Sequence, residues 1–501
     1  MIAITESAPF LVDYADVPAL RQTLSGIGRA GYCEAAVVKR LGLHDIAGLH
    51  WRNLAIYRDE RLAERDALAV AIDLFLLQGV LHGDELRRLL PDASRDVLLR
   101  TGLIEIEETG LARARVSLFP VGARLIFADH AWPELPHPGY ATVPYGHVMA
   151  VGLDSRHLAH VTVRRRVRSA LDLCTGSGVQ ALLAAEHAQR VVAVDINPRA
   201  VRCARFNAQA LGAANLEAVE GDLFDPVCGE VFDLITANPP FVPSPVDALG
   251  FRDGGPSGED IQKRIVAGLP NHLAPGGIAQ IVTELGERDG EPITGRLRRW
   301  LGGAPMDIYV LRLASYTAAH YATGHAKGEG YAAFLDSSRA WAGNLRAQGY
   351  ARVVSVLVSF QWSSGGGLWE RVDESRAPER PAGAEIEKAF LAERLASDPE
   401  LRRYLGASRL RPAGPIALFD ASVLGAAIPA KARATRLGQA LSIEHELEPI
   451  ERQVLARMEG RTGTELLQLC SEIHGEEPAV IEAVRSLLRR RLIELGAPQE
   501  P

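Results

Sequence analysis

Cysteine is scarce in this sequence. The 501 residues contain five cysteines, namely Cys33, Cys174, Cys203, Cys228 and Cys470. The number is odd, no two of them form a C-x-x-C pair, and no histidine lies near them at zinc-ligand spacing. Disulfide frameworks and structural zinc sites depend on such patterns. We therefore expect a reduced, cytoplasmic protein without a metal site.

Long apolar runs and an excess of positive charge are also missing. The most apolar window, residues 67–81, contains Asp73 and Gln78, so no membrane span is expected. The formal net charge is −7, which excludes a chain-wide cationic field, and nucleic acid could be bound only by a local basic patch. A hydrophobic fraction of 47% excludes disorder as the main state.

The pattern of elements predicts three domains, an α/β domain between two smaller ones. Residues 1–140 show apolar residues at helical spacing, in an order that suits a winged helix or a helical cap on the next domain. Residues 141–365 alternate β-branched runs with helices, which predicts a seven-stranded, Rossmann-like, mostly parallel sheet. Residues 366–501 are expected to form a small, mainly helical accessory domain.

A glycine-rich turn follows the first strand of the α/β unit. The segment runs from Asp172 through Cys174 and Thr175 to Gly176 and Gly178, and a helix follows it. Glycines at such a turn let the backbone approach a ligand, and a helix N-terminus suits a nucleotide-like cofactor. The same turn is compatible with a nicotinamide site or with a purely structural strand-to-helix connection.

Acidic residues end the next two strands. Asp195 comes about twenty residues after the turn, where a carboxylate can accept hydrogen bonds from ribose hydroxyls. Asp222 ends the third strand and could accept from an adenine amino group, or could simply cap a turn. We include the residues that follow them, Ile196 and Leu223, in the predicted cofactor site.

The fourth strand ends in Asn238-Pro239-Pro240-Phe241. Two prolines stiffen the turn and remove backbone donors, which leaves the Pro239 carbonyl free and directs the Asn238 amide into the cleft. Two acceptors then face one point, where a planar NH2 group can donate a hydrogen to each. Phe241 offers a face on which that group can stack. Asn238, Pro239 and Phe241 are the predicted catalytic residues.

Together these motifs resemble the class I S-adenosylmethionine-dependent methyltransferases of the N-P-P-[YF] group. The loop after N-P-P-F, with a G-x-x-G element before a helix, is similar to that of release-factor glutamine methyltransferases, which carry a methyltransferase small domain. The resemblance covers residues 140–290. It implies S-adenosylmethionine as cofactor and assigns to its site the residues Asp172, Cys174, Thr175, Gly176, Gly178, Asp195, Ile196, Asp222, Leu223 and Asn238. Cys174 stands where the family usually has glycine.

The favoured function is N-methylation of a protein glutamine side chain. An adenine or guanine amine of RNA or DNA presents the same planar NH2, so nucleic acid binding and base methylation remain an alternative. A small-molecule acceptor and a non-catalytic scaffold of the same fold are two further alternatives. We interpret His157 and His160 as surface or cap histidines, and the basic runs 164–168 and 489–491 as solvated faces.

Overall fold

A computed structural model was used to describe the chain. It describes residues 16–130, 132, 146–246, 249–328, 330–363, 368–420, 432–458, 461–462, 465, 468 and 476–498. The expected domain boundaries near 140 and 365 remain predictions, because residues 133–145 and 364–367 lie outside the described residues. Cys470 also lies outside them. No helix in the described part of the chain is long and apolar enough to cross a membrane.

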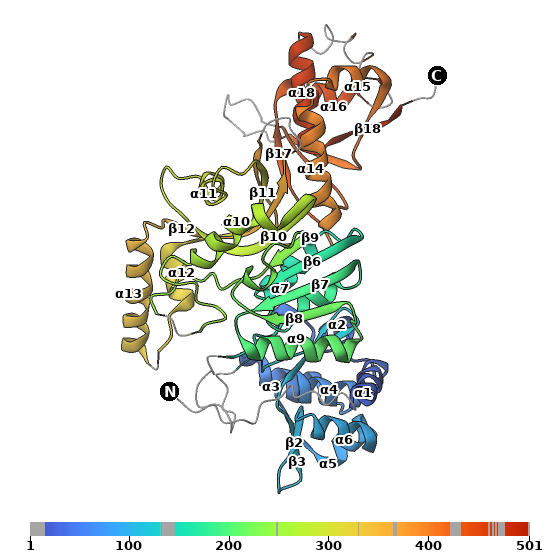
Figure 1. Ribbon diagram of the computed structural model, residues 1–501, viewed down its shortest axis with the longest axis vertical. Coiled ribbons are helices and arrows are strands. Elements are labelled where there is room, and N and C mark those ends of the chain that lie inside the picture. The colour runs from blue at the N-terminus through green and yellow to red at the C-terminus, as the bar shows by residue number, and fades with distance from the viewer. Residues whose placement is uncertain are drawn as a thin grey trace.

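A mixed, mostly parallel sheet forms the centre of the molecule (Figure 1). The strands in spatial order are β13 (Glu370–Glu374), β11 (Met306–Thr317), β12 (Arg352–Trp362), β10 (Leu273–Glu287), β9 (Phe232–Ala237), β6 (Val167–Leu173), β7 (Ala188–Asp195) and β8 (Leu216–Glu220). β12 runs antiparallel to both of its neighbours, and the other pairs are parallel. The α/β sheet expected from the sequence is thus confirmed, with eight strands instead of seven, because β13 joins it at an edge.

Apolar residues alternate along the strands, so both faces of the sheet are covered. Leu171 and Val192 pack on one face with α10 (Asp260–His272) and α11 (Ile293–Trp300). Ala170 and Val191 pack on the other face. The helices on that second face are α7 (Leu153–Val161), α8 (Val179–Ala184), α9 (Pro198–Leu211) and α14 (Gly383–Ser397).

The N-terminal module packs against α9 at one end of the molecule (Figure 1). Its elements are α1 (Val17–Arg29), α2 (Glu34–Leu41), α3 (Leu54–Ile56), α4 (Ala67–Phe75), β1 (Val80–His82), α5 (Gly83–Leu89), α6 (Asp92–Arg100), β2 (Ile104–Ile106), β3 (Leu111–Ala114), β4 (Ser117–Val121) and β5 (Arg124–Ala128). The run from α4 to β3, with an antiparallel β1-β3-β2 sheet, has the element order of a winged helix.

The C-terminal module lies at the opposite end (Figure 1) and is mixed rather than mainly helical. Besides α14 it contains α15 (Leu401–Ala407), β14 (Ser408–Pro412), β15 (Ile416–Asp420), β16 (Ala432–Arg436), β17 (Glu444–Leu447), α16 (Pro449–Arg457), α18 (Glu477–Arg489) and β18 (Ile493–Pro498). These strands are only four to six residues long. A strand this short shows too little alternation of apolar and polar residues to be recognised in a sequence. For that reason the sequence pattern favoured helices in this module.

Arg491, expected on a solvated face, and His157, expected to be a surface or cap histidine, are both buried. Arg491 is 4% exposed and donates to the Glu385 carbonyl of α14 at 2.8 Å, so the basic run 489–491 is not a solvated face throughout. His157 is 8% exposed within α7, where burial lowers its pKa to about 4. Arg491 lies against Tyr309 and Asp373 of the sheet, and His157 lies near Asp45 of the N-terminal module.

Two helices connect β11 to β12 in the sequence. They are α12 (Ala318–His325) and α13 (Tyr331–Ala347), which project from the side of the sheet (Figure 1). The sequence pattern predicts one helix in this region, over residues 331–348, which α13 matches, and it gives no indication of α12. Tyr321 of α12 and Trp341 of α13 share an apolar cluster with Phe241, so this insertion packs against the segment that follows β9.

Candidate active site

The turn after β6 is anchored by a buried carboxylate. Asp172 is 1% exposed and accepts hydrogen bonds from the Thr175 hydroxyl at 2.6 Å and from the Thr236 hydroxyl at 2.8 Å. It also accepts from the backbone N–H of Ala181 in α8, at 3.2 Å. Burial raises its pKa to about 6, against the effect of these hydrogen bonds. Asp172 therefore fixes the turn to α8 and β9, and direct contact with a cofactor stays a prediction.

Both glycines of the turn have left-handed backbone, which favours glycine. Gly178 has a φ of 83°, and a Cβ there would lie 3.0 Å from the Cβ of Ala204 in α9. Gly176 has a φ of 55°, and a Cβ there would meet no atom within 4 Å. Gly178 is thus required for close packing, whereas Gly176 faces open space in which a ligand can approach the backbone.

Cys174 takes the same left-handed conformation, with a φ of 55°. A residue with a Cβ is strained there by roughly 1–2 kcal/mol. The thiol is partly buried, and burial raises its pKa, so it is present as the neutral thiol. The turn thus keeps the backbone that glycine would give, at a cost in stability.

We expect Cys174→Gly to stabilise the protein by about 1 kcal/mol, because the strain is relieved at a position whose backbone suits glycine. Thermal and urea unfolding would measure the change. Cys228→Gly is the matched control, since Cys228 has an ordinary φ of −54° and glycine there only adds flexibility to the unfolded chain. Equal effects of the two substitutions would contradict strain at Cys174.

Asp195 ends β7 beside this turn. Its Oδ2 accepts from the Gly176 N–H at 2.8 Å and its Oδ1 from the Asn197 N–H at 2.9 Å. Burial raises its pKa. Each carboxylate oxygen retains a second lone pair, so the group can still accept from a ligand hydroxyl. The next residue, Ile196, is 67% exposed, which is unusual for a large apolar side chain and suits a face on which a ring can lie.

Asp222 and Leu223 follow β8 at the same edge of the sheet. Asp222 accepts from Arg264 of α10 at 2.8 Å, and this ion pair leaves its other carboxylate oxygen available. Leu223 is 8% exposed and has a positive φ of 51°. The carboxyl ends of β6, β7 and β8 thus bring together all the side chains predicted to bind a cofactor except Asn238.

Asn238 comes directly after β9 at the same edge. Its Nδ2 donates to the Ser155 hydroxyl of α7 at 3.0 Å, which fixes the orientation of the amide. No donor from the described residues contacts Asn238 Oδ1 or the Pro239 carbonyl. Both predicted acceptors are therefore available. Phe241 is only 8% exposed, because the α12–α13 insertion packs against it.

The G-x-x-G element lies directly against the N-P-P-F segment. A Cβ on Gly258 would lie 2.4 Å from the Phe241 carbonyl oxygen and 2.9 Å from the Pro243 nitrogen. The element itself runs from Gly255 to Gly258, and a Cβ on Gly254, the residue before it, would lie 2.9 Å from the Pro240 carbonyl oxygen. Gly254 and Gly258 are thus needed because two stretches of backbone are in close contact.

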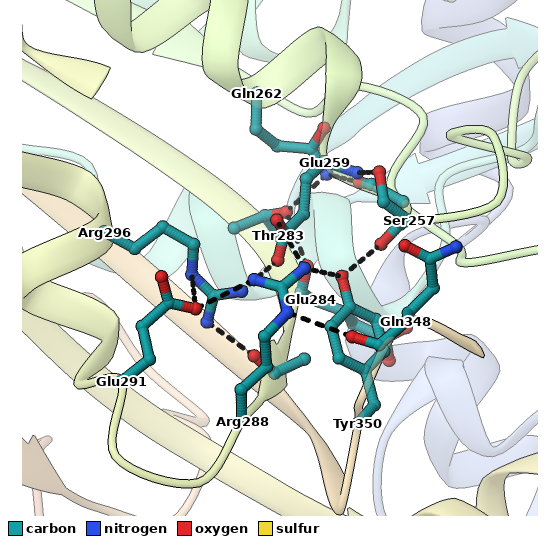
Figure 2. A network of polar contacts seen from close by, with 12 residues as sticks. Ser257, Glu259, Gln262, Thr283, Glu284, Arg288, Glu291, Arg296, Gln348 and Tyr350 are labelled. Atoms are coloured by element: carbon teal, nitrogen blue, oxygen red, sulfur yellow. Dashed lines mark hydrogen bonds and ion pairs between the residues drawn. The ribbon is translucent and has the colours of Figure 1, made fainter. Parts of the chain in front are cut away.

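A polar network holds this element in place (Figure 2). Glu259 forms ion pairs with the buried Arg296 and, at 3.5 Å, with Arg288. The Tyr350 hydroxyl donates to the Ser257 carbonyl at 2.8 Å. The network links the start of α10 to α11, to the end of β10 and to the segment before β12, so it supports the G-x-x-G element that packs against the N-P-P-F segment.

Four side chains near Asn238 were not predicted. Ser155 and Asp154 begin α7, Glu284 lies on β10 and Tyr321 on α12. Each comes from an element far from the N-P-P-F motif in sequence, so no local pattern marks it. In the described part of the chain, no group of three or more His, Cys, Asp or Glu side chains could hold a metal ion.

Comparison with known proteins places this site in a family. Residues 151–289 match the family described as methyltransferase small domain. A putative protein N5-glutamine methyltransferase of Methanocaldococcus jannaschii is 39% identical over 136 residues, which cover 26% of this chain and 68% of that protein.

Two bacterial relatives are longer. The release factor glutamine methyltransferase of Geobacter sulfurreducens is 36% identical over 29% of this chain and 57% of its own length. The ribosomal protein uL3 glutamine methyltransferase of Bradyrhizobium diazoefficiens is 39% identical over 25% of this chain and 42% of its own length. The chain therefore spans about half of these two relatives. The turn after β6, the acids after β7 and β8, and Asn238 all lie on one edge of the sheet. These matches show that the chain belongs to the methyltransferase small-domain family of S-adenosylmethionine-dependent methyltransferases.

Proposed function

We propose that this enzyme transfers a methyl group to the side-chain amide nitrogen of a glutamine in a protein. The observation that carries the proposal is the Asn238 amide, whose NH2 end is held by Ser155, while no donor of the described residues contacts its oxygen or the carbonyl of the next residue, Pro239. Two acceptors fixed in this way match the two hydrogens of a carboxamide NH2. The names of the three relatives, all glutamine methyltransferases, support the same acceptor.

The residues at the edge of the sheet fit the cofactor. Asp195 would accept from the ribose hydroxyls, the exposed Ile196 would lie against the adenine, and Asp222 would accept from the adenine amine. The open space at Gly176 leaves room for the rest of the molecule. S-adenosylmethionine supplies an activated methyl group, so the protein has no need to create a strong nucleophile.

Positioning is the main task of Asn238 and Pro239 in this proposal. Holding the acceptor nitrogen about 3–3.5 Å from the methyl carbon supplies much of the acceleration. The two acceptor oxygens also stabilise the partial positive charge that develops on the nitrogen in the transition state. The acceptor is therefore bound more tightly as the methyl group is transferred.

The test is methyl transfer by the full-length chain. Purified release factor, ribosomal protein uL3, ribosomal RNA and the metabolite fraction of a cell lysate would each be incubated with methyl-labelled S-adenosylmethionine and enzyme. Label on a glutamine of a protein, located by mass spectrometry, is the expected result. Label confined to RNA would replace the proposal with base methylation, and label confined to metabolites of a lysate would replace it with small-molecule methylation.

We expect Asp195→Ala to weaken binding of S-adenosylmethionine by about 1–3 kcal/mol, because the ribose hydroxyls lose a charged acceptor. Calorimetric titration would measure it. Asp225→Ala is a suitable control, because Asp225 begins the short 3-10 helix after β8 and is not among the predicted site residues. Unchanged affinity in a folded Asp195→Ala protein would show that the ribose acid lies elsewhere.

A further inference from the structure

A carboxylate without a cationic partner lies next to the acceptor site. Glu284 is on β10, whose Ile281 pairs with Ala237 at the end of β9. Glu284 is three residues further along β10, so it extends past the end of β9, where Asn238 begins the N-P-P-F segment. Within the described residues no Lys or Arg forms an ion pair with Glu284, whereas Glu287 on the same strand pairs with Arg312 at 2.8 Å.

The partner of Glu284 is a hydroxyl from the insertion. Tyr321 of α12 is 3% exposed and donates to Glu284 Oε2 at 2.5 Å. The Tyr321 ring is stacked on His325, with ring centroids 4.2 Å apart, and is packed near Trp341. The insertion therefore fixes Glu284 from one side, and only one of its oxygens is occupied by this bond.

Asp154 of α7 is a second acidic side chain near both Glu284 and Tyr321. It precedes Ser155, the residue that holds the Asn238 amide, and its charge acts on Glu284. Side chains from α7, β10 and α12 thus gather near the end of β9, with Ser155 bound to Asn238 and Tyr321 bound to Glu284. The other charged or titratable side chains that act on Tyr321 are Arg252, in the loop after β9, and His325.

The proposed reaction needs a proton acceptor at this place. An amide nitrogen carries two hydrogens, and when it bonds to the methyl carbon it must lose one of them to become a neutral N-methyl amide. Asn238 and Pro239 offer neutral oxygens, which bind these hydrogens but are too weakly basic to remove one. Glu284 is a carboxylate on β10 past the end of β9; the residue is only partly buried, and Tyr321 occupies only its Oε2.

We propose that the Glu284 carboxylate is the catalytic base that takes the proton released by the acceptor nitrogen. This inference rests on the proposed function. The N–CH3 bond forms as the S–CH3 bond breaks, the sulfur keeps the electron pair of the broken bond, and one N–H bond breaks with its electrons returning to nitrogen. The proton passes to Glu284 Oε1 and then to solvent. Tyr321 is a positioning residue, which holds the carboxylate at the site.

The electrostatic surroundings suit a base that works near neutral pH. Burial, with a further contribution from Asp154, raises the pKa of Glu284 to about 7, while the Tyr321 hydrogen bond opposes that rise. A base acts only when deprotonated. Turnover should therefore rise as pH increases through about 7 and level off above it.

The test uses the full-length enzyme with S-adenosylmethionine and whichever acceptor the wild-type enzyme labels. In Glu284→Gln we expect turnover to fall by about 100-fold or more and its rise with pH to disappear, while calorimetry should show unchanged cofactor affinity.

Two further variants should shift the midpoint of the pH profile. In Tyr321→Phe the midpoint should move up, because the hydrogen bond that lowers the pKa of Glu284 is lost. In Asp154→Asn it should move down, because a neighbouring negative charge is removed. Glu287→Gln is the matched control and should leave the midpoint unchanged.

A second measurement needs no acceptor. Infrared difference spectra of the protein alone, with and without Glu284→Gln, would give the midpoint at which the Glu284 carboxyl ionises, and the kinetic midpoint should match it. A pH-dependent turnover that survives Glu284→Gln, or midpoints that do not move in Tyr321→Phe and Asp154→Asn, would overturn the inference. Label on RNA instead of glutamine would overturn the proposed function alone, because the same profiles can be recorded with RNA as acceptor.

Discussion

Asn238→Ala is expected to reduce turnover by about 100-fold or more, as removal of a preorganised polar group does in other enzymes. Although the family resemblance also counts Asn238 in the cofactor site, the affinity for S-adenosylmethionine should be nearly unchanged, because Asp195 and Asp222 make the proposed polar contacts with the cofactor. The Asn238 side chain is held by Ser155 on the acceptor side of the N-P-P-F segment, and its oxygen is free to bind the acceptor NH2. Calorimetry measures the affinity, and methyl transfer under saturating cofactor measures the turnover.

Ser155→Ala provides a graded control for this result. It removes the hydroxyl that orients the Asn238 amide but leaves the amide itself, so the loss of turnover should be smaller than in Asn238→Ala. A folded Asn238→Ala protein with normal turnover would contradict the N-methylation mechanism. An effect of Ser155→Ala larger than that of Asn238→Ala would mean that Ser155 acts on the substrate directly.

The motifs that could be predicted from the sequence are those at strand ends. Cys174 to Gly178, Asp195, Asp222 and Asn238 each follow an apolar run, and carboxyl ends of neighbouring parallel strands meet at one edge. The structure places all of them there. The sheet order could not be predicted from the sequence, because it depends on which strands pair over long separations.

The parts that were missed have weak local signals. β13 reads E-R-V-D-E, which has a single apolar residue and no alternation, so this edge strand resembled a linker. Glu284 and Tyr321 are 37 residues apart, and they meet only because α12, which packs near β11 and β12, brings Tyr321 to β10. Such a contact carries no signal in a single sequence, which is why the predicted site contained Asn238 but neither of these side chains.

Gly258→Ala is expected to abolish most turnover and to destabilise the protein, although Gly258 need not touch substrate. Two effects are combined at this position. The φ of 72° disfavours any residue with a Cβ, and that Cβ would lie 2.4 Å from the Phe241 carbonyl oxygen. The contact is with backbone, so it can be relieved only if the N-P-P-F segment moves away. A displacement of about 1 Å at a reacting group can cost about 100-fold in rate.

Gly255→Ala separates these two effects. Gly255 has a similar φ of 80°, but a Cβ there would meet only the Asp260 carboxylate, at 3.1 Å, and that side chain can move. Both variants should therefore lose stability from backbone strain, by roughly 1–2 kcal/mol in Gly255→Ala and more in Gly258→Ala. Only Gly258→Ala should also lose turnover at a temperature where both proteins are fully folded. If the two variants keep equal turnover there, close packing of the G-x-x-G element does not position Asn238, and the network that supports this element has no part in catalysis.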